Sequence, residues 1–209
     1  MPRRRPVEPP PRALPPAPTR GRPRCEQAHR AILTATLELL RDDGWLALTI
    51  DAIAKRAGVA RTTIYRWWPS SSVIAVDVLV ELGATVAPSP AGGGDPLRAI
   101  RLEMRRLAAV ATELPGRVLC AVLGEAQHDP TVRAALFERL IFPRREATLR
   151  VIRDAQARGL LRDDLSPGAI ADMFYGPIFY RMLMGHEPPT ERFATQTFER
   201  VLVGLTPER

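Results

Sequence analysis

The chain has 209 residues, 45% of them hydrophobic, and a net charge of +7, which suits one or two compact domains and a polyanionic partner. Its two cysteines, Cys25 and Cys120, are too few for a disulfide scaffold and form no ligand cluster with histidines, so a reducing compartment is expected and a metal site is not. The longest uncharged stretch, 82–94, is far shorter than the roughly 20 apolar residues of a membrane span, so we expect a cytoplasmic protein with no membrane partner.

The first 24 residues form a basic arm that we expect to be disordered or extended. Seven arginines against one glutamate place most of the net charge here, and nine of the 21 prolines also precede Cys25. With almost no large apolar residues, this segment cannot bury enough surface to offset the entropy of ordering. Attraction to nucleic acid must therefore come mostly from the arm, with local patches of the folded part to help.

The spacing of apolar residues predicts three helices with a tight turn after the arm. The first covers 28–43, the second covers 50–57 with Thr49 as its cap, and a short third covers about 61–67. Gly58 and Val59 make the turn between the second and the third helix. The order of the elements and the short turn are typical of a helix-turn-helix.

The rest of the chain also reads as helical. A longer helix is expected from Ser70 to Thr85, and the loop at 88–94 is the expected domain boundary. Three later helices should start where a capping side chain precedes a proline, at Asp95-Pro96, Asp129-Pro130 and Ser166-Pro167. Stops are expected at Gly116, Gly159 and 185–189, and a last helix should run from Thr190 to about Gly204. We predict an all-α chain of about nine helices, divided into the arm (1–24), a helix-turn-helix domain with its connecting helix (25–86) and a larger helical domain (87–209).

Residues 28–79 carry several motifs in a fixed order. An Ile-Leu pair and small residues lead to a Gly-aromatic step, a threonine precedes the second helix, an Ile-Ala-x-x-Ala-Gly-Val turn follows, and Tyr-x-x-aromatic closes the third helix. The residues concerned are Ile32-Leu33, Ala35, Leu37, Gly44-Trp45, Thr49, 53–59 and 65–68. In this register they resemble the amino-terminal domain of the tetracycline-repressor (TetR) family of bacterial transcriptional regulators. The resemblance implies a dimer that places its two third helices in successive major grooves of a pseudo-palindromic operator.

On this resemblance, the third helix is the recognition helix. Its candidates for base edges are Arg61, Thr62, Thr63 and Arg66, and the candidates for phosphates are Thr49, Tyr65 and Trp67. Three departures from the family pattern affect this surface. Ala60 replaces a serine cap worth about 1 kcal/mol, Ser71 replaces a lysine, and Trp67 replaces a histidine. We therefore expect a weaker grip on phosphates than the family average, for which the basic arm can compensate.

The arm ends in Arg20-Gly21-Arg22-Pro23-Arg24, which resembles the core of an AT-hook. In that motif the backbone is extended and the arginines enter a narrow minor groove, where the negative potential is enhanced. Arg20 and Arg22 are therefore candidate DNA contacts. The alternative is a solvated basic tail that adds only non-specific affinity.

Beyond residue 88, the segments 158–162, 175–181 and 185–188 look like the carboxy-terminal domain of one TetR subgroup. The resemblance implies dimerisation through the helices at 166–184 and 190–204, and a pocket for a small-molecule effector. The candidate lining residues, each of which also suits plain core, are Met104, Leu107, Cys120, Leu123, Phe137, Ile141, Phe174 and Ile178. No charged constellation stands out, and the mostly apolar lining that the family implies would suit a hydrophobic or aromatic ligand.

Enzyme signatures are missing from the sequence. His186-Glu187 begins like a zinc-binding H-E-x-x-H motif, but two prolines follow and the second histidine is absent. No nucleophile elbow, P-loop or dinucleotide fingerprint occurs. We therefore expect no enzyme and no cofactor.

The resulting hypothesis is a homodimeric repressor that a small hydrophobic ligand releases from double-stranded operator DNA. One alternative is a non-specific or architectural DNA-binding protein in which the arm supplies the affinity. Another is a helix-turn-helix domain used for protein interaction, for which the lysine lost at Ser71 is faint support.

Overall fold

The computed structural model describes residues 22–83 and 94–207, with side chains described from Cys25 on. Every regular element within these ranges is helical, which confirms the predicted all-α class. Ten α-helices, a 3-10 turn (η1) and a π-helical turn (η2) make up this part of the chain. Their bounds are α1 Arg22–Asp42, η1 Trp45–Ala47, α2 Ile50–Ala57, α3 Arg61–Tyr65, α4 Ser71–Gly83, α5 Pro96–Ala111, α6 Leu114–Glu125, α7 Pro130–Leu136, η2 Phe137–Ile141, α8 Phe142–Ala157, α9 Pro167–Met184 and α10 Glu191–Leu205.

Besides Ser70, whose hydroxyl accepts from the Val73 N–H at 3.4 Å at the start of α4, short polar side chains cap five of the helices at their start. Each accepts a hydrogen bond from a backbone N–H of the first turn, which would otherwise lack a partner. The capping residues are Thr49, Asp95, Asp129, Ser166 and Thr190, at N···O distances of 2.7 to 3.2 Å. All five starts are where the sequence predicts them.

Gly116 does not end a helix, contrary to the prediction. Helix α5 ends at Ala111, and Gly116 lies in the first turn of α6. A Cβ at Gly116 would lie only 2.0 Å from the carbonyl oxygen of Ala111. Glycine is needed there because the two helices approach closely, a requirement that local sequence cannot distinguish from a helix stop.

Two other segments also differ from the prediction. Helix α1 begins at Arg22, so the backbone of 22–24 is helical rather than part of an extended arm. Between α7 and α8, residues 137–141 form the π-helical turn η2, which was not predicted. Single π-helical turns are often found at functional sites, and η2 contributes to the cavity described below.

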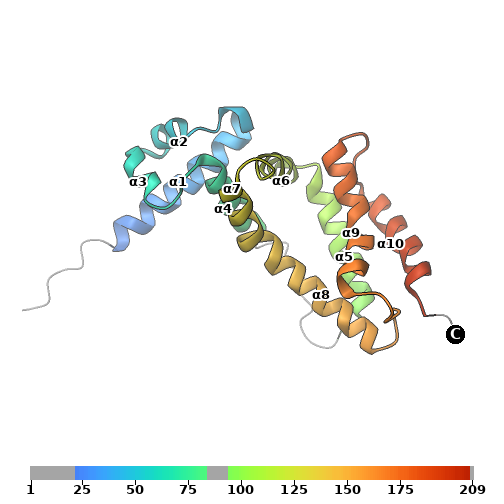
Figure 1. Ribbon diagram of the computed structural model, residues 1–209. Helices are drawn as coiled ribbons and strands as arrows, with labels where there is room; N and C mark the ends of the chain where they lie inside the picture. The colour runs from blue at the N-terminus through green and yellow to red at the C-terminus, as the bar shows by residue number, and fades with distance from the viewer. Residues whose placement is uncertain (1–21, 84–93, 208–209) are drawn as a thin grey trace, which may run out of the picture.

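Two hydrophobic cores follow one another along the molecule. The first packs α1 to α4 against α6, α7 and η2, and contains Ile53, Ile64, Trp68 and Ile74. The second lies among α5, α8, α9 and α10. Figure 1 shows α1 to α3 at one end, α5, α9 and α10 at the other, and α4, α6 and α7 between them. Because α4 shares the first core with α6, α7 and η2, a movement of these elements acts directly on α4.

Candidate nucleic-acid interface and ligand cavity

The turn between α2 and α3 orients the candidate DNA-contacting side chains. Gly58 ends α2 with φ +65°, a left-handed conformation that favours glycine, and the Val59 N–H donates to the Ala54 carbonyl at 3.1 Å. Ile64 on the inner side of α3 and Trp68 just after it are buried. The opposite side of α3 is therefore turned to solvent.

The candidate contact residues divide by exposure. Five of them are exposed and available to a duplex without rearrangement of the core: Thr49, Arg61, Thr62, Tyr65 and Arg66. Thr63 and Trp67 are only half-buried. The Trp67 ring meets the rings of His29 and Trp68 edge-on, each at 5.6 Å between centroids. Trp67 thus belongs to an aromatic cluster between α1 and the end of the helix-turn-helix, a role that the sequence did not predict.

Asp51 forms an ion pair with Arg61 on the candidate DNA-contacting surface, which the sequence did not predict. The Arg61 Nε lies 2.5 Å from Asp51 Oδ1, and both side chains are more than half exposed. Asp51 also lies in the first turn of α2, where a carboxylate faces the positive end of the helix dipole. Exposed ion pairs contribute little free energy, so Arg61 can exchange this carboxylate for a phosphate or a base edge at small cost.

Two departures from the expected sequence pattern have structural counterparts. Ala60 stands at the N-cap of α3 and makes no side-chain capping bond. The Ser71 hydroxyl donates to the Leu48 carbonyl at 3.0 Å, which ties the start of α4 to the segment before α2. Ser71 therefore supports the domain itself where a lysine would have contributed a cation.

The two arm residues with expected DNA contacts are not placed by the structure. Arg20 lies outside the described residues, and Arg22 is described only in its backbone, as the first residue of α1. Because 22–24 are helical, the AT-hook-like segment is not extended over its whole length.

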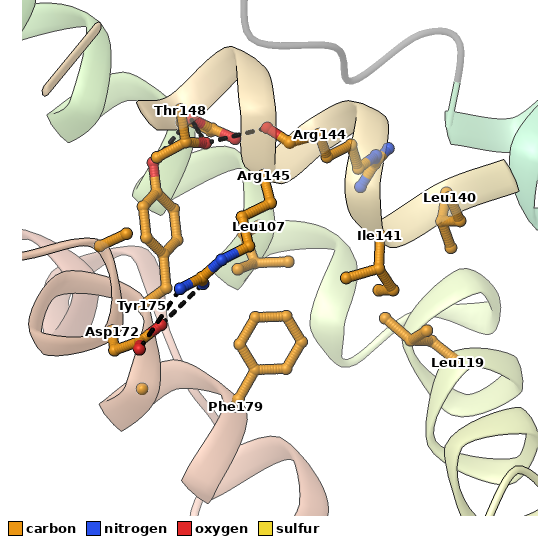
Figure 2. Close-up of a pocket in the computed structure, with 13 residues that line it drawn as sticks. Leu107, Leu119, Leu140, Ile141, Arg144, Arg145, Thr148, Asp172, Tyr175 and Phe179 are labelled. Carbon is orange, nitrogen blue, oxygen red and sulfur yellow. Dashed lines mark hydrogen bonds and ion pairs between the residues drawn. The ribbon is translucent and has the colours of Figure 1, made fainter. Parts of the chain in front are cut away.

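A cavity of about 390 Å³ lies among α5, α6, η2, α8 and α9 (Figure 2). Its size is within the range of small-molecule sites. The apolar side of the wall is made by Leu107, Leu119, Leu140, Ile141, Ala171, Gly176 and Phe179. The polar side is made by Glu103, Arg144, Arg145, Thr148, Asp172 and Tyr175. The structure therefore assembles a charged constellation that was not expected from the sequence.

Two of the eight candidate lining residues, Leu107 and Ile141, border this cavity. The others lie elsewhere: Met104, Phe174 and Ile178 in the second core, Leu123 and Phe137 against the first core, and Cys120 half-buried with its thiol 3.4 Å from the Met182 carbonyl. Helical periodicity marks the inward face of a helix but does not separate core from cavity wall, because both are apolar.

Glu103 is the centre of a polar network inside the cavity. The Tyr175 hydroxyl donates to Glu103 Oε2 at 2.6 Å, and the Thr148 hydroxyl lies 3.5 Å from the same oxygen. Burial raises the pKa of Glu103, against the lowering effect of the Tyr175 hydrogen bond. Burial and the charge of Glu103 raise the pKa of Tyr175 well above its usual value, so the phenol keeps its proton and remains a donor.

Arg145 and Asp172 bridge α8 and α9 at the edge of the cavity. The two guanidinium nitrogens lie 2.7 and 3.4 Å from the two carboxylate oxygens. Figure 2 shows this pair beside Phe179, and both side chains are exposed. The hydrogen bond with Asp172 raises the pKa of Arg145. The pair thus neutralises itself on the solvent side of the cavity.

Arg144 connects the cavity to α4. Its Nη2 donates to the carbonyl of Gly83, the last residue of α4, at 3.0 Å. Burial lowers the pKa of Arg144, and the attraction of Glu103 partly offsets this. A second cavity of about 220 Å³ is bordered by Arg144 and by Leu79, Leu82 and Gly83 of α4. The sequence offered no signal for this residue, because its contact joins positions 61 residues apart.

An apolar surface remains uncovered on α9 and α10. Met173, Tyr180 and Met184 follow one another at helical spacing along α9 and are exposed, as are Leu183 beside them and Val203 on α10. Exposed apolar side chains gathered on adjacent helices are typical of interaction surfaces. The two helices also contact one another, so their exposed residues can form one surface.

Among the residues that the structure describes, no three His, Cys, Asp or Glu side chains are placed to hold a metal ion. No single helix in this part of the chain is long and apolar enough to span a membrane, and α5 and α6 meet that test only jointly, as a pair bent by 85°. Cys25 and Cys120 are free thiols.

Known protein families match both the helix-turn-helix segment and the helices around the cavity. A family model described as bacterial regulatory proteins, tetR family, matches residues 32–72, and one described as tetracyclin repressor-like, C-terminal domain, matches residues 90–201. The HTH-type transcriptional regulator YdeS of Bacillus subtilis is 34% identical over 165 residues, which are 79% of this chain and 83% of YdeS.

Solved structures agree with these sequence matches. The TetR family transcription regulator SCO0332 is 28% identical and superposes with a TM-score of 0.71 over 87% of this chain and all of its own. Thermus thermophilus FadR, a TetR family transcriptional repressor crystallised with lauroyl-CoA, is 25% identical, with a TM-score of 0.68 over 87% of this chain and 96% of its own. The similarity therefore includes the helix-turn-helix and the helices around the cavity.

Proposed function

Because the chain belongs to the TetR family of helix-turn-helix transcriptional regulators, which are not enzymes, we propose that it is a homodimeric repressor released from its operator by a small ligand. The observation that carries ligand control is the position of α4. This helix packs on α1, and its last residue, Gly83, accepts a hydrogen bond from Arg144 on the cavity wall. A ligand that moves the wall therefore acts on the helix that supports the DNA-binding surface.

Operator recognition is assigned to α3 and the start of α2. In a two-fold dimer, the two α3 helices enter successive major grooves, with Arg61, Thr62, Thr63 and Arg66 at base edges. Thr49, Tyr65 and Trp67 are the proposed phosphate contacts. The exposure of five of these seven side chains supports the assignment.

Dimerisation is assigned to the exposed apolar surface of α9 and α10. Burying the stripe of Met173, Tyr180 and Met184 against its symmetry mate would remove apolar area from water, which favours association. This interface would set the distance between the two recognition helices.

The ligand is proposed to have an apolar body. Seven of the 13 residues that line the cavity are apolar. They are three leucines, Ile141, Phe179, Ala171 and Gly176. The related FadR of Thermus thermophilus was crystallised with lauroyl-CoA, a molecule with an apolar acyl chain. Both observations favour a hydrophobic ligand, with the polar wall residues left to determine its head group.

The test is a selection of duplex fragments on the purified full chain at physiological salt, followed by sequencing of what is retained. An enriched inverted repeat is the expected result. Arg66→Ala should weaken binding to that repeat by about 1–3 kcal/mol, whereas Arg150→Ala, which removes an exposed arginine from α8, should not. Failure to retain DNA would instead favour a protein-interaction role.

The charge of the arm favours one other candidate, a non-specific or architectural DNA-binding protein. Most of the net charge lies in residues 1–24, and Ser71 supplies no cation. Deleting residues 1–21 separates the two functions. Retained preference for the repeat with a shallower salt dependence supports the repressor, and loss of all binding supports the arm-driven protein. The double substitution Arg20→Ala and Arg22→Ala tests whether the AT-hook-like segment alone contributes to this binding and its salt dependence.

A further inference from the structure

The two arginines on the cavity wall, Arg144 and Arg145, have partners of different charge. Arg145 is paired with Asp172, whereas the Arg144 guanidinium forms no ion pair within the described residues and donates to the neutral carbonyl of Gly83. We propose that the effector carries a carboxylate that binds Arg144 in exchange for this carbonyl, and that the exchange releases the end of α4. The inference rests on the proposed function, since it names the ligand class and the switch of the same cavity.

A carboxylate is the partner that Arg144 lacks. Guanidinium and carboxylate form two parallel hydrogen bonds in which both partners are charged, whereas a backbone carbonyl contributes no charge of its own. The carbonyl of Gly83 offers a single neutral acceptor at 3.0 Å. An acidic ligand in the cavity can therefore compete successfully for the guanidinium.

The remaining polar groups of the wall already have partners. Asp172 is held by Arg145, and Glu103 accepts from Tyr175. Figure 2 shows the Arg144 guanidinium pointing away from Tyr175 and Thr148, toward the side of the cavity where Leu140 and Ile141 lie. Glu103 attracts Arg144 but is already bonded to Tyr175, so a ligand carboxylate can approach the guanidinium from this side, with its apolar body facing the leucine and isoleucine side chains.

The contact with Gly83 makes Arg144 a cap for α4. A cation at the carboxyl end of a helix stabilises the unpaired carbonyls and the negative end of the helix dipole. The fit is close, because a Cβ on Gly83 would lie 2.5 Å from the Arg144 Nη2. Arg144 also borders the smaller cavity together with Leu79 and Leu82 of α4. Drawing the guanidinium toward a ligand removes both the cap and part of the packing beneath α4.

The ligand class is tested with matched probes on the full chain. Straight-chain carboxylates from butanoate to dodecanoate, benzoate and phenylacetate are each compared with the amide and the amine of the same skeleton by titration calorimetry. At least one acid is expected to bind about tenfold more tightly than its amide and its amine, a difference typical of a charge-assisted pair. Binding by none of the acids, or equal or tighter binding of the amide or amine, overturns the proposal.

The role of Arg144 is tested by substitution. R144Q should abolish the preference for acids and R144K, which keeps the charge, should retain part of it. R150Q is the matched control, because Arg150 is an exposed arginine on the same helix α8 but does not border the cavity. An unchanged acid preference in R144Q, or an equal loss in R150Q, contradicts the assignment, and the R144K result distinguishes a lost contact from a misfolded chain.

The switch is tested with the selected operator. The acid that binds should release DNA from the wild-type chain but not from R144Q, and ligand-free R144Q should bind the operator about threefold to fivefold more weakly, as expected for a lost helix cap. If the wild-type chain binds no operator, the proposed function fails. If it binds the operator and the amide releases it as well as the acid does, only this inference fails.

Discussion

The indole N–H of Trp68, buried just after the recognition helix, donates to Asp77 Oδ2 on α4 at 2.6 Å. The other oxygen of the same carboxylate is held at 2.7 Å by Arg139 of η2. One carboxylate on α4 therefore joins the DNA-binding helices to the π-helical turn that supplies Leu140 and Ile141 to the cavity wall. A shift of η2 would therefore act on Trp68 through two charge-assisted hydrogen bonds.

Asp77→Asn tests this connection. The change keeps the shape of the side chain but removes its charge and one acceptor, so both hydrogen bonds weaken. We expect the free energy of unfolding to fall by about 1.5–3 kcal/mol, the range for hydrogen bonds to charged groups. Urea denaturation measures the loss. The control is Asp154→Asn, which disrupts an exposed ion pair between Asp154 of α8 and Arg158 just after that helix. A loss of stability in Asp77→Asn no larger than in this control would contradict the role given to Asp77.

Asp51→Asn should strengthen operator binding. The substitution frees Arg61 from its carboxylate and removes a negative charge from the surface that is proposed to face phosphates. Because the pair is exposed, the gain should be modest, about twofold to fivefold, and should shrink as salt rises. Titration of the selected repeat at two salt concentrations measures it. Weaker binding by this variant would mean that Asp51 serves to orient Arg61 toward DNA.

Features encoded by a few neighbouring residues could be predicted from the sequence. Capping side chains before proline mark three helix starts, and the Gly58 turn places Ile64 inside and Arg66 outside. Each of these depends on contacts within one helical turn, where residue type and spacing decide the outcome.

Features that depend on distant segments could not be predicted in this way. The carboxylate of Glu103 meets Thr148 and Tyr175, which lie 45 and 72 residues away in sequence. On α5, Leu107 borders the cavity while the nearby Met104 is core, although both are apolar and on the inward face. The packing of α5 against α8 and α9 determines which of the two residues lines the cavity. The spacing of apolar residues within α5 carries no information about that packing.

Tyr180→Glu tests the proposed dimer surface. Tyr180 lies in the middle of the exposed stripe on α9, and a glutamate there would place two like charges near the two-fold axis and leave apolar neighbours uncovered. We expect dissociation to monomers at micromolar concentration in sedimentation velocity. Leu102→Glu makes the same kind of change on the exposed face of α5 and should leave the dimer intact. Dissociation by both variants, or by neither, would place the interface elsewhere.

Glu103→Gln tests the energetic cost of the buried carboxyl. Burial raises the pKa of Glu103 above its ordinary value, so the folded state favours the protonated form more than the unfolded state does. The contribution of this group to stability is therefore complete below the unfolded pKa and is lost as pH rises through the folded pKa. Glutamine does not titrate, so the stability of the variant relative to the wild-type chain should increase with pH across that window and then level off.

Thermal unfolding of the two chains between pH 4 and pH 7.5 measures this difference, because their other titrating groups cancel. Tyr175→Phe supplies the internal control. It removes the hydroxyl whose hydrogen bond lowers the pKa of Glu103, so the window should move to higher pH in that background. A stability difference between Glu103→Gln and wild type that does not change with pH would show that Glu103 is ionised equally easily in the folded and unfolded chains. The cavity would then be wetter and more polar than its packing implies.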